Sequence, residues 1–308
     1  GTSALNQNTT GTRNTAVGAN ALDSNTTANY NSAFGTHAGS SITTGSLNSV
    51  FGDYALVATT TGTSNSAFGQ AALGTNTTGI ENTAVGRDAL YANTTGSYSI
   101  AVGKSALISN TTGIKNIALG REGMKTNVSG IQNVAMGYQA LYSNATGSDN
   151  LGIGDSAGYY VTGGGNITVG SRINGGGYGP VFDITSQNNY LSMGHTATTN
   201  AYVKVAWTVT SDARDKSNFA EVPHGLSFVN QLAPYSYEFK LDREEAETDG
   251  IVRYGFKAQD ILALEGDNPV IIDNQEPDSL RYREAALIPV LVKAIQELTA
   301  RLETLEGE

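Results

Sequence analysis

The 308-residue chain has no cysteine and few charged residues. Each of these two absences argues against a class of functional site. Without cysteine, neither a disulfide framework nor a thiolate metal site can form. Charged residues make up 15% of the chain, against roughly 25% in an average globular domain. The net charge is −10, which disfavours a surface for nucleic acid, because phosphate contacts require clustered Lys and Arg.

Long apolar runs are missing as well. No stretch of about 18 or more apolar residues is present, and the opening GTSALNQNTT lacks the basic and apolar regions of a signal peptide. We therefore expect no membrane insertion and no targeting segment. Because the repeat described below begins almost at Gly1, we also expect a fragment or a processed product whose attachment region is missing.

Groups that could hold a metal or another cofactor are also lacking. His37, His195 and His224 are scattered, with no histidine or carboxylate at the spacing of metal ligands. Neither a Gly-rich phosphate loop nor a separated pair of glycosidase carboxylates can be recognised. The sequence therefore predicts no metal and no cofactor.

What the chain has in abundance is glycine, with 37 residues against 6 prolines, and the glycines follow a repeat. The motif Asn-x-Ala-apolar-Gly recurs ten times with small variations, as in NTAVG, NSAFG and NIALG. Its last residue keeps a step of 17, and then once of 16, at Gly18, Gly35, Gly52, Gly69, Gly86, Gly103, Gly120, Gly137, Gly154 and Gly170. A second glycine keeps the step of 17 at Gly45, Gly62, Gly79, Gly96, Gly113, Gly130 and Gly147.

Each repeat reads as one rung of a β-solenoid. We expect a short strand, a corner that needs glycine, a second short strand around Ala-Leu and a loop of Asn, Thr and Gly. A rung with so few apolar side chains cannot bury a core alone, so the rungs must stack into a rod. The small residues suggest strands close to an axis that three chains can share. The motif resembles the rungs of trimeric adhesin heads and of phage fibre shafts, although those adhesin rungs are shorter.

The Asn-Thr-Thr-Gly loops are interpreted as solvated turns. Some match the N-glycosylation pattern, as at Asn25 and Asn93, but that pattern matters only in a eukaryotic secretory route. A ladder of Asn and Thr that binds a host polysaccharide stays open as an alternative.

The composition changes after the repeats. Residues 1–170 hold 6 Lys or Arg and 7 Asp or Glu, whereas residues 171–308 hold 12 and 21. We expect a β-repeat shaft over 1–170, a β connector over 171–210 built from stretches such as PVFDIT and NYLSMG, and a globular domain over 211–308.

The globular part resembles a known family. The segments that carry the resemblance are SDARDKSN at 211–218, GLSFVNQLAPYSYEFK at 225–240, YGFKAQDI at 254–261 and ALIPVLVKAIQELTARLETLE at 286–306. They are similar to the intramolecular chaperone, or peptidase S74, domain that ends endosialidase tailspikes and many tail fibres. Phe219 and Lys257 depart from the family pattern.

The resemblance implies a site at the start of this domain. Ser211 would be the nucleophile that attacks the Thr210–Ser211 peptide bond, with Lys216 as general base. A lysine serves as base only when burial or a neighbouring cation lowers its pKa. Asp212 would cap or orient the turn, and Arg214 and Asn218 would order the backbone or polarise the carbonyl. The enzymatic activity expected is at most a single-turnover, intramolecular serine autopeptidase. A charged, hydrated turn without catalytic role is the alternative.

The last segment predicts a helix over 284–306. Its apolar residues follow alternating steps of three and four, the pattern of a coiled-coil seam, namely Ile288, Leu291, Ile295, Leu298, Leu302 and Leu305. Three chains could associate along this seam. An amphipathic helix packed only on its own domain is the alternative.

These observations predict a mainly β, trimeric structural protein with an α+β C-terminal chaperone domain. The leading hypothesis is a segment of a homotrimeric viral tail fibre or surface appendage, located in the virion or outside the cell. Its partners would be its own copies and a fibre base or other virion component. The alternative is a receptor-binding protein or bacterial adhesin head that recognises a host surface glycan. A membrane-released transcription factor, as in eukaryotic relatives of the chaperone domain, is disfavoured by the lack of a basic region and a membrane span.

Overall fold

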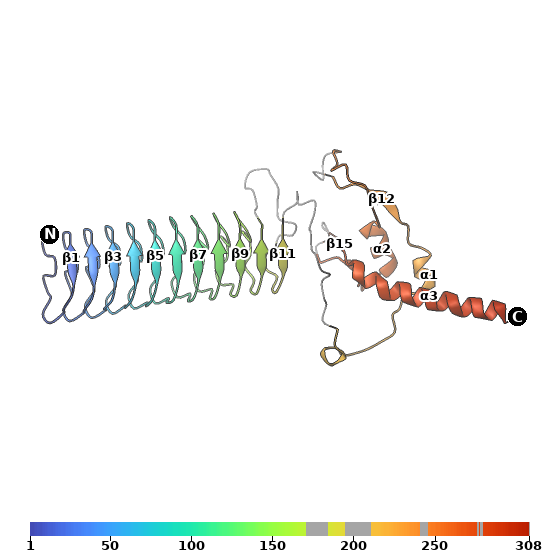
Figure 1. Ribbon diagram of the computed structural model, residues 1–308, viewed down its shortest axis with the longest axis horizontal. Helices are drawn as coiled ribbons and strands as arrows, with labels where there is room; N and C mark the ends of the chain where they lie inside the picture. The colour runs from blue at the N-terminus through green and yellow to red at the C-terminus, as the bar shows by residue number, and fades with distance from the viewer. Residues whose placement is uncertain (171–183, 195–210, 241–245, 276, 278–279, 308) are drawn as a thin grey trace. The chain divides into compact units, whose positions relative to one another are not determined.

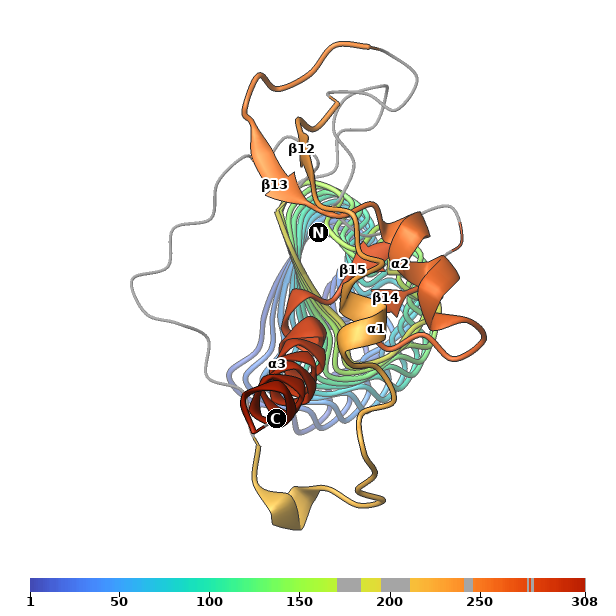
Figure 2. The same cartoon turned by 90° about the vertical axis from the view of Figure 1, so that its right-hand side faces the viewer.

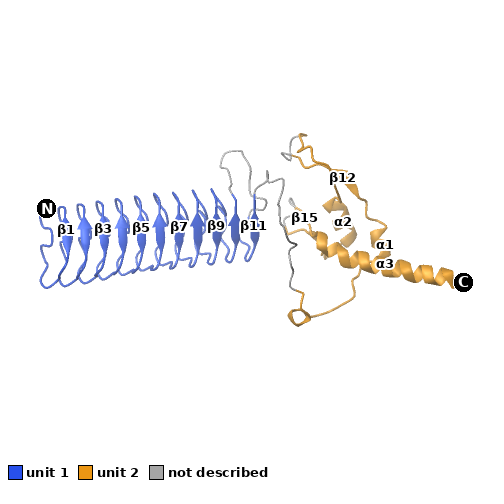
Figure 3. Cartoon of the chain, viewed as in Figure 1, with its two compact units in different colours: residues 1–201 blue, residues 202–308 orange. Residues whose placement is uncertain are grey.

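The computed structural model describes residues 1–170, 184–194, 211–240, 246–275, 277 and 280–307. The chain divides into two compact units, Gly1–Ala201 and Tyr202–Glu308 (Figure 3). Each unit is described by itself below.

Unit 1 is a solenoid with one three-residue strand in each rung (Figure 1). Its strands form a single parallel sheet in chain order. They are β1 Thr15–Val17, β2 Ser32–Phe34, β3 Ser49–Phe51, β4 Ser66–Phe68, β5 Thr83–Val85, β6 Ile100–Val102, β7 Ile117–Leu119, β8 Val134–Met136, β9 Leu151–Ile153, β10 Ile167–Val169 and β11 Leu191–Met193. Seen along the axis, the rungs lie one behind another (Figure 2). The predicted solenoid of 17-residue rungs is confirmed.

The register of the sheet follows the repeat. Ala16 pairs with Ala33 and Ala84 with Ala101, so equivalent residues of neighbouring rungs are hydrogen-bonded neighbours. The sheet continues beyond Gly170. Strand β11 lies inside the stretch expected as a connector, and it pairs with β10, the last strand before Gly170. The remaining parts of that stretch, 171–183 and 195–210, lie outside the described residues.

The interior of the solenoid is filled by small side chains from the same chain. In most strands the middle residue is buried and its two neighbours face outward, as the alternation of a β-strand requires. Ala67 and Ala84 on two strands, and Leu73 and Leu90 on the turns facing them, are fully buried. The small residues therefore fill the narrow inside of each rung, and their size is explained without an axis shared by three chains.

The prediction of a second short strand around Ala-Leu is wrong. That segment is a succession of turns, and the leucine adopts a left-handed backbone conformation, with φ of 49° at Leu22 and 51° at Leu90. A residue in this region cannot continue an extended strand. The turn still joins the rungs, since the Leu22 N–H donates to the Ala38 carbonyl at 3.0 Å.

The glycine that ends each motif is required by the close approach of the next rung. Gly52 has φ of 138°, and a Cβ there would lie 2.5 Å from the carbonyl oxygen of Gly69. Both the conformation and the space exclude any other residue. The recurrence of glycine at this point of every rung is therefore a packing requirement.

Two ladders of asparagine run inside the solenoid. In the first, the Asn48 N–H donates to Asn31 Oδ1 at 2.9 Å, and Asn48 Nδ2 donates to the Gly62 carbonyl at 3.0 Å. In the second, Asn93 Nδ2 donates to Asn76 Oδ1 at 2.8 Å and to the Gly96 carbonyl at 2.9 Å. Each amide side chain thus satisfies buried backbone groups of the loops.

The second ladder corrects the interpretation of the Asn-Thr-Thr-Gly loops as solvated turns. Except for the half-buried Asn8 of the first loop, the asparagines of these loops are fully buried, Asn25 and Asn93 among them, and the exposed loop residues are mostly threonines. A buried amide that holds the loop is also not presented to a glycan or to a glycosylating enzyme.

Unit 2 is an α+β domain. It begins with the single-turn 3-10 helix η1 Ala213–Asp215 and the short helix α1 Leu226–Val229. An antiparallel pair follows, β12 Tyr235–Tyr237 with β13 Arg253–Gly255, and then α2 Ala258–Glu265. A second pair, β14 Ile272–Asp273 with β15 Arg281–Tyr282, leads into α3 Glu284–Glu306. The predicted terminal helix is confirmed.

The described residues of unit 2 form one small core. Its buried apolar side chains are Phe228, Ile261, Ile271, Ile272, Leu287 and Val290. Many large apolar side chains of the same unit are exposed, among them Phe219, Tyr254 and Ile295. A single copy of this unit leaves much of its apolar surface uncovered, which is typical of a domain that associates with others.

Candidate functional site

The predicted nucleophile and base meet in one turn. Lys216 Nζ donates a hydrogen bond to Ser211 Oγ at 2.7 Å, within the reach expected of a base and its nucleophile. The two residues are five apart in the sequence, and the 3-10 turn η1 between them folds the chain back. The contact is therefore local and requires no other part of the domain.

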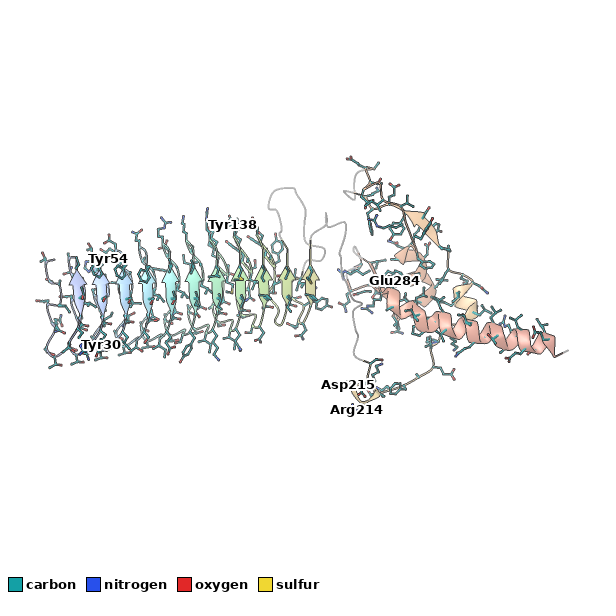
Figure 4. The ribbon with its side chains drawn as sticks, in the orientation of Figure 1. Tyr30, Tyr54, Tyr138, Arg214, Asp215 and Glu284 are labelled. Carbon is teal, nitrogen blue, oxygen red and sulfur yellow. The ribbon has the colours of Figure 1, made fainter. Side chains whose placement is uncertain are left out.

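Asp212 caps this turn. Its Oδ1 accepts a hydrogen bond from the Arg214 N–H at 2.9 Å, and its Oδ2 accepts one from Arg214 Nη2 at 2.6 Å. The side-chain hydrogen bonds from Arg214, followed by the backbone one, lower the pKa of the Asp212 carboxyl below its ordinary value. The carboxylate stays ionised in this turn and fixes the backbone between Ser211 and Lys216. Figure 4 labels Arg214 and Asp215 at this bend.

The remaining predicted site residues, Asn218 and Thr210, are not part of the described contact between Ser211 and Lys216. Asn218 is exposed, with a left-handed φ of 55°, two residues beyond Lys216. Thr210, on the acyl side of the bond predicted to be cut, lies outside the described residues.

The turn is open to solvent in a single chain. Ser211, Arg214 and Lys216 are all exposed. In the arrangement seen, the lysine is the donor, whereas a general base must accept a proton through a neutral amine. Burial disfavours the charged form of a lysine, so a lysine base requires a site covered from water. The two side chains of a Ser-Lys dyad are in contact, and among the described residues they remain exposed to water.

The second functional element is the predicted seam of α3. All six seam residues are exposed, with Ile295 at 63% and Leu298 at 46% of their surface. The helix instead packs on its own unit through a neighbouring face, formed by Leu287, Val290 and Ala294. The described packing of α3 is thus on its own domain, as in the alternative of an amphipathic helix, and the seam residues lie exposed beside that face.

The start of the seam borders an apolar hollow. This hollow has a volume of about 630 Å³, and its lining includes Val229, Leu232, Phe256, Tyr282, Ile288 and Leu291. The first two seam residues are thus part of a concave apolar surface.

Sequence reasoning missed the charged residues that hold this unit together. Glu297 Oε2 accepts the N–H of Leu226 at 2.8 Å and so caps α1, while Lys293 Nζ donates to the Val222 carbonyl at 2.6 Å. The carboxylate of Glu265 accepts three backbone N–H groups, from Val270, Ile271 and Ile272. The only signal in the sequence was that Lys293 and Glu297 stand beside the predicted seam.

Over the part of the chain that the structure describes, no helix is both long and apolar enough to cross a membrane. Within the same residues, no cluster of three or more histidines and carboxylates could hold a metal ion.

Comparison with known families gives a match for the domain that begins at the turn of Ser211 and Lys216. Residues 211–268 match the peptidase S74 family, described as chaperone of endosialidase. The C-terminal unit carries an endosialidase-type chaperone domain. The match starts at Ser211, the residue of the Ser-Lys contact, and the predicted resemblance is confirmed. No curated protein and no solved structure matches the chain.

Proposed function

We propose that the chain is a structural segment of a homotrimeric viral tail fibre or surface appendage. The solenoid is the shaft, and the chaperone domain directs trimerisation and then cuts itself from the shaft between Thr210 and Ser211. The observation that carries this proposal is the exposed seam of α3 in a unit that contains a chaperone domain.

The seam supports self-association because its apolar side chains are exposed and the described residues of its own unit do not cover them. Full burial of one Leu or Ile side chain stabilises by about 1.5–3 kcal/mol. Six such residues at coiled-coil spacing would therefore provide a substantial driving force for helix association. Ala294 and Leu287 already face the domain, so the seam is free for other copies of α3.

The repetitive solenoid gives a reason why such a trimer would need a chaperone, namely to align the three shafts. Each rung hydrogen-bonds to the next in the same chain, so one shaft can fold on its own contacts. Rungs are nearly alike, however, so shafts placed side by side can slide by whole rungs at little cost. A domain that first joins the three C-terminal ends would fix the alignment of the shafts.

The cleavage step would use the Ser-Lys contact. The hydroxyl proton of Ser211 passes to a neutral Lys216 amine while Oγ bonds to the carbonyl carbon of Thr210. The C–N bond then breaks, and the proton is delivered to the new amino group of Ser211. Water hydrolyses the resulting ester, which releases the Thr210 carboxylate and restores the hydroxyl. A single intramolecular turnover is favoured by the effective concentration of the attached nucleophile.

The alternative of a glycan-binding fibre or adhesin head has less support. The asparagines of the loops are buried in structural hydrogen bonds. Several surface aromatic rings cover each other's faces, as Phe34 and Phe51 do at a centroid distance of 4.7 Å and Tyr142 and Tyr159 at the same distance. Ring faces that stack on each other are not available to stack on a sugar.

The trimer can be tested with adjacent residues of α3. Ile295→Glu places a charge on the seam, whereas Gln296→Glu places the same charge one residue away on an exposed position. We expect light scattering of the full chain to give a trimer for Gln296→Glu and loss of the trimer for Ile295→Glu. Equal masses for the two variants would contradict assembly through this seam.

A further inference from the structure

The outward face of the solenoid sheet is apolar over its whole length. The third residue of every strand points outward and is apolar, and in most rungs it is exposed, as Val102 is at 38% and Met193 at 57%. These residues are Val17, Phe34, Phe51, Phe68, Val85, Val102, Leu119, Met136, Ile153, Val169 and Met193. We call this row the outer stripe.

The outer stripe widens along the shaft. The first residue of each strand, which faces the same way, is Ser or Thr in β1–β5. From β6 onward it is apolar, as Ile100, Ile117, Val134, Leu151, Ile167 and Leu191. Over β6–β11 the outer face is thus two apolar side chains wide. At about 4.8 Å per strand, the whole stripe is on the order of 50 Å long, and at roughly 7 Å between alternate residues its wider part over β6–β11 is on the order of 24 Å by 7 Å.

Charged residues do not enter this stripe, and they occur at several positions along its two edges. None of the eleven strands contains a charged residue. Charges occur two residues outside the strands, as Glu81 and Arg87 do around β5 and Lys115 and Arg121 around β7. Tyr30 and Tyr138 mark these two edges of the sheet in Figure 4. An apolar centre with a polar rim is the composition of a protein–protein interface.

The fixed spacing of the stripe selects its partner. A row of apolar side chains repeated at the distance between strands is matched by another row with the same repeat. The purified chain itself provides such a row, and a narrow stripe on each of three rods can face one common axis. Closed rotational symmetry about an axis along the rods places equal rungs at equal height.

We propose that the outer stripe is the surface along which three parallel shafts of this chain pack, rung against equal rung. This inference rests on the proposed homotrimer and adds the surface of the shaft that the trimer buries. It assigns the outer apolar residues to contacts between chains, since the inner ones already fill the solenoid. The wider part, β6–β11, carries most of the contact.

The absence of native cysteine allows a direct test. Val102→Cys places the single thiol on the stripe, and Thr112→Cys places it on an exposed loop position of the same rung. The full chains also carry Ser211→Ala so that they stay intact. We expect a short bismaleimide to join the Val102→Cys chains into covalent dimers on a denaturing gel, with little product from Thr112→Cys.

The outcomes separate this inference from the proposed function. Trimers in solution whose Val102→Cys chains do not cross-link, or cross-link no better than Thr112→Cys chains, would overturn the stripe as the interface and leave the homotrimer intact. Chains that are monomeric in solution would overturn the homotrimer and this inference with it. A mixture of Val102→Cys chains with Met136→Cys chains tests whether equal rungs of neighbouring chains face each other. Cross-links between unlike chains as frequent as those between like chains would exclude packing of equal rungs.

Discussion

Single hydrogen bonds decide whether the turn at the start of the chaperone domain can act. The 2.7 Å contact between Lys216 Nζ and Ser211 Oγ was predicted from the family resemblance, and its five-residue spacing makes it a local contact. The exposure of the turn could not be read from the sequence, because it depends on what packs over these residues in the assembly.

Loss of either partner is expected to abolish cleavage. Ser211→Ala removes the nucleophile, and Lys216→Ala removes the base, so both variants should remain at the full chain mass while the wild type splits between Thr210 and Ser211. Intact mass spectrometry and a denaturing gel of freshly expressed protein measure this. A Ser211→Ala chain cut at the same bond would refute the dyad. A wild type that stays whole but forms trimers would leave an assembly domain without protease activity.

The pairing of Asp212 with Arg214 predicts a pH dependence of the turn. Because these hydrogen bonds lower the pKa of the Asp212 carboxyl, their stabilisation is fully present above the ordinary pKa of aspartate and is lost as the pH falls through the lowered value. In Arg214→Ala, the titration of Asp212 should therefore move upward in pH. NMR of chains with labelled aspartate carboxyls, assigned with Asp212→Asn, measures the midpoint. An unchanged midpoint would show that Arg214 does not hold the carboxylate.

At the scale of the element, two positions of the rung that are three residues apart change their residue types together. Most rungs carry Leu on the turn and Asn three residues later, as Leu22 and Asn25 do. Two rungs replace the Leu by Gly, and both replace that Asn by a β-branched apolar residue, giving Gly39 with Ile42 and Gly158 with Val161. A Cβ on Gly39 would lie 2.9 Å from Ile42 Cδ1, so the isoleucine occupies the space that the leucine fills elsewhere.

This exchange predicts a rescue. Gly39→Leu alone should destabilise the shaft by about 1–3 kcal/mol through overpacking against Ile42. Gly39→Leu combined with Ile42→Asn should recover most of that loss, because φ of 59° at this position is one that leucine adopts in other rungs. The new amide would also face Asn25 Oδ1, a buried atom without a hydrogen-bond partner. Thermal unfolding of the four variants of the cycle measures the coupling, and additive effects would contradict it.

The sequence predicted the rung but only part of its geometry. The step of 17 fixed the strand and the glycine corner, since a strand of three residues and a tight turn both leave periodic signals. The turn around Ala-Leu was taken for a strand because leucine in a left-handed conformation has no signature of its own. The loop asparagines were taken for solvated residues because turn chemistry alone does not reveal that Asn76 and Asn93 face the interior.

At the scale of the whole molecule, two apolar surfaces are exposed among the described residues, the seam of α3 and the outer stripe of the shaft. The seam was predicted from the heptad spacing, and its exposure distinguishes it from the face that packs on its own domain. The outer stripe could not be predicted from the motif, because an apolar residue in a three-residue strand can point inward or outward. The proposed homotrimer would use both surfaces for contacts between chains.

The mass of the intact particle tests the homotrimer most directly. Light scattering of the full-length Ser211→Ala chain, over a range of concentrations, avoids loss of the chaperone domain by cleavage. We expect a particle of three times the 32.1 kDa chain mass. A particle of a single chain mass at all concentrations would contradict the homotrimer.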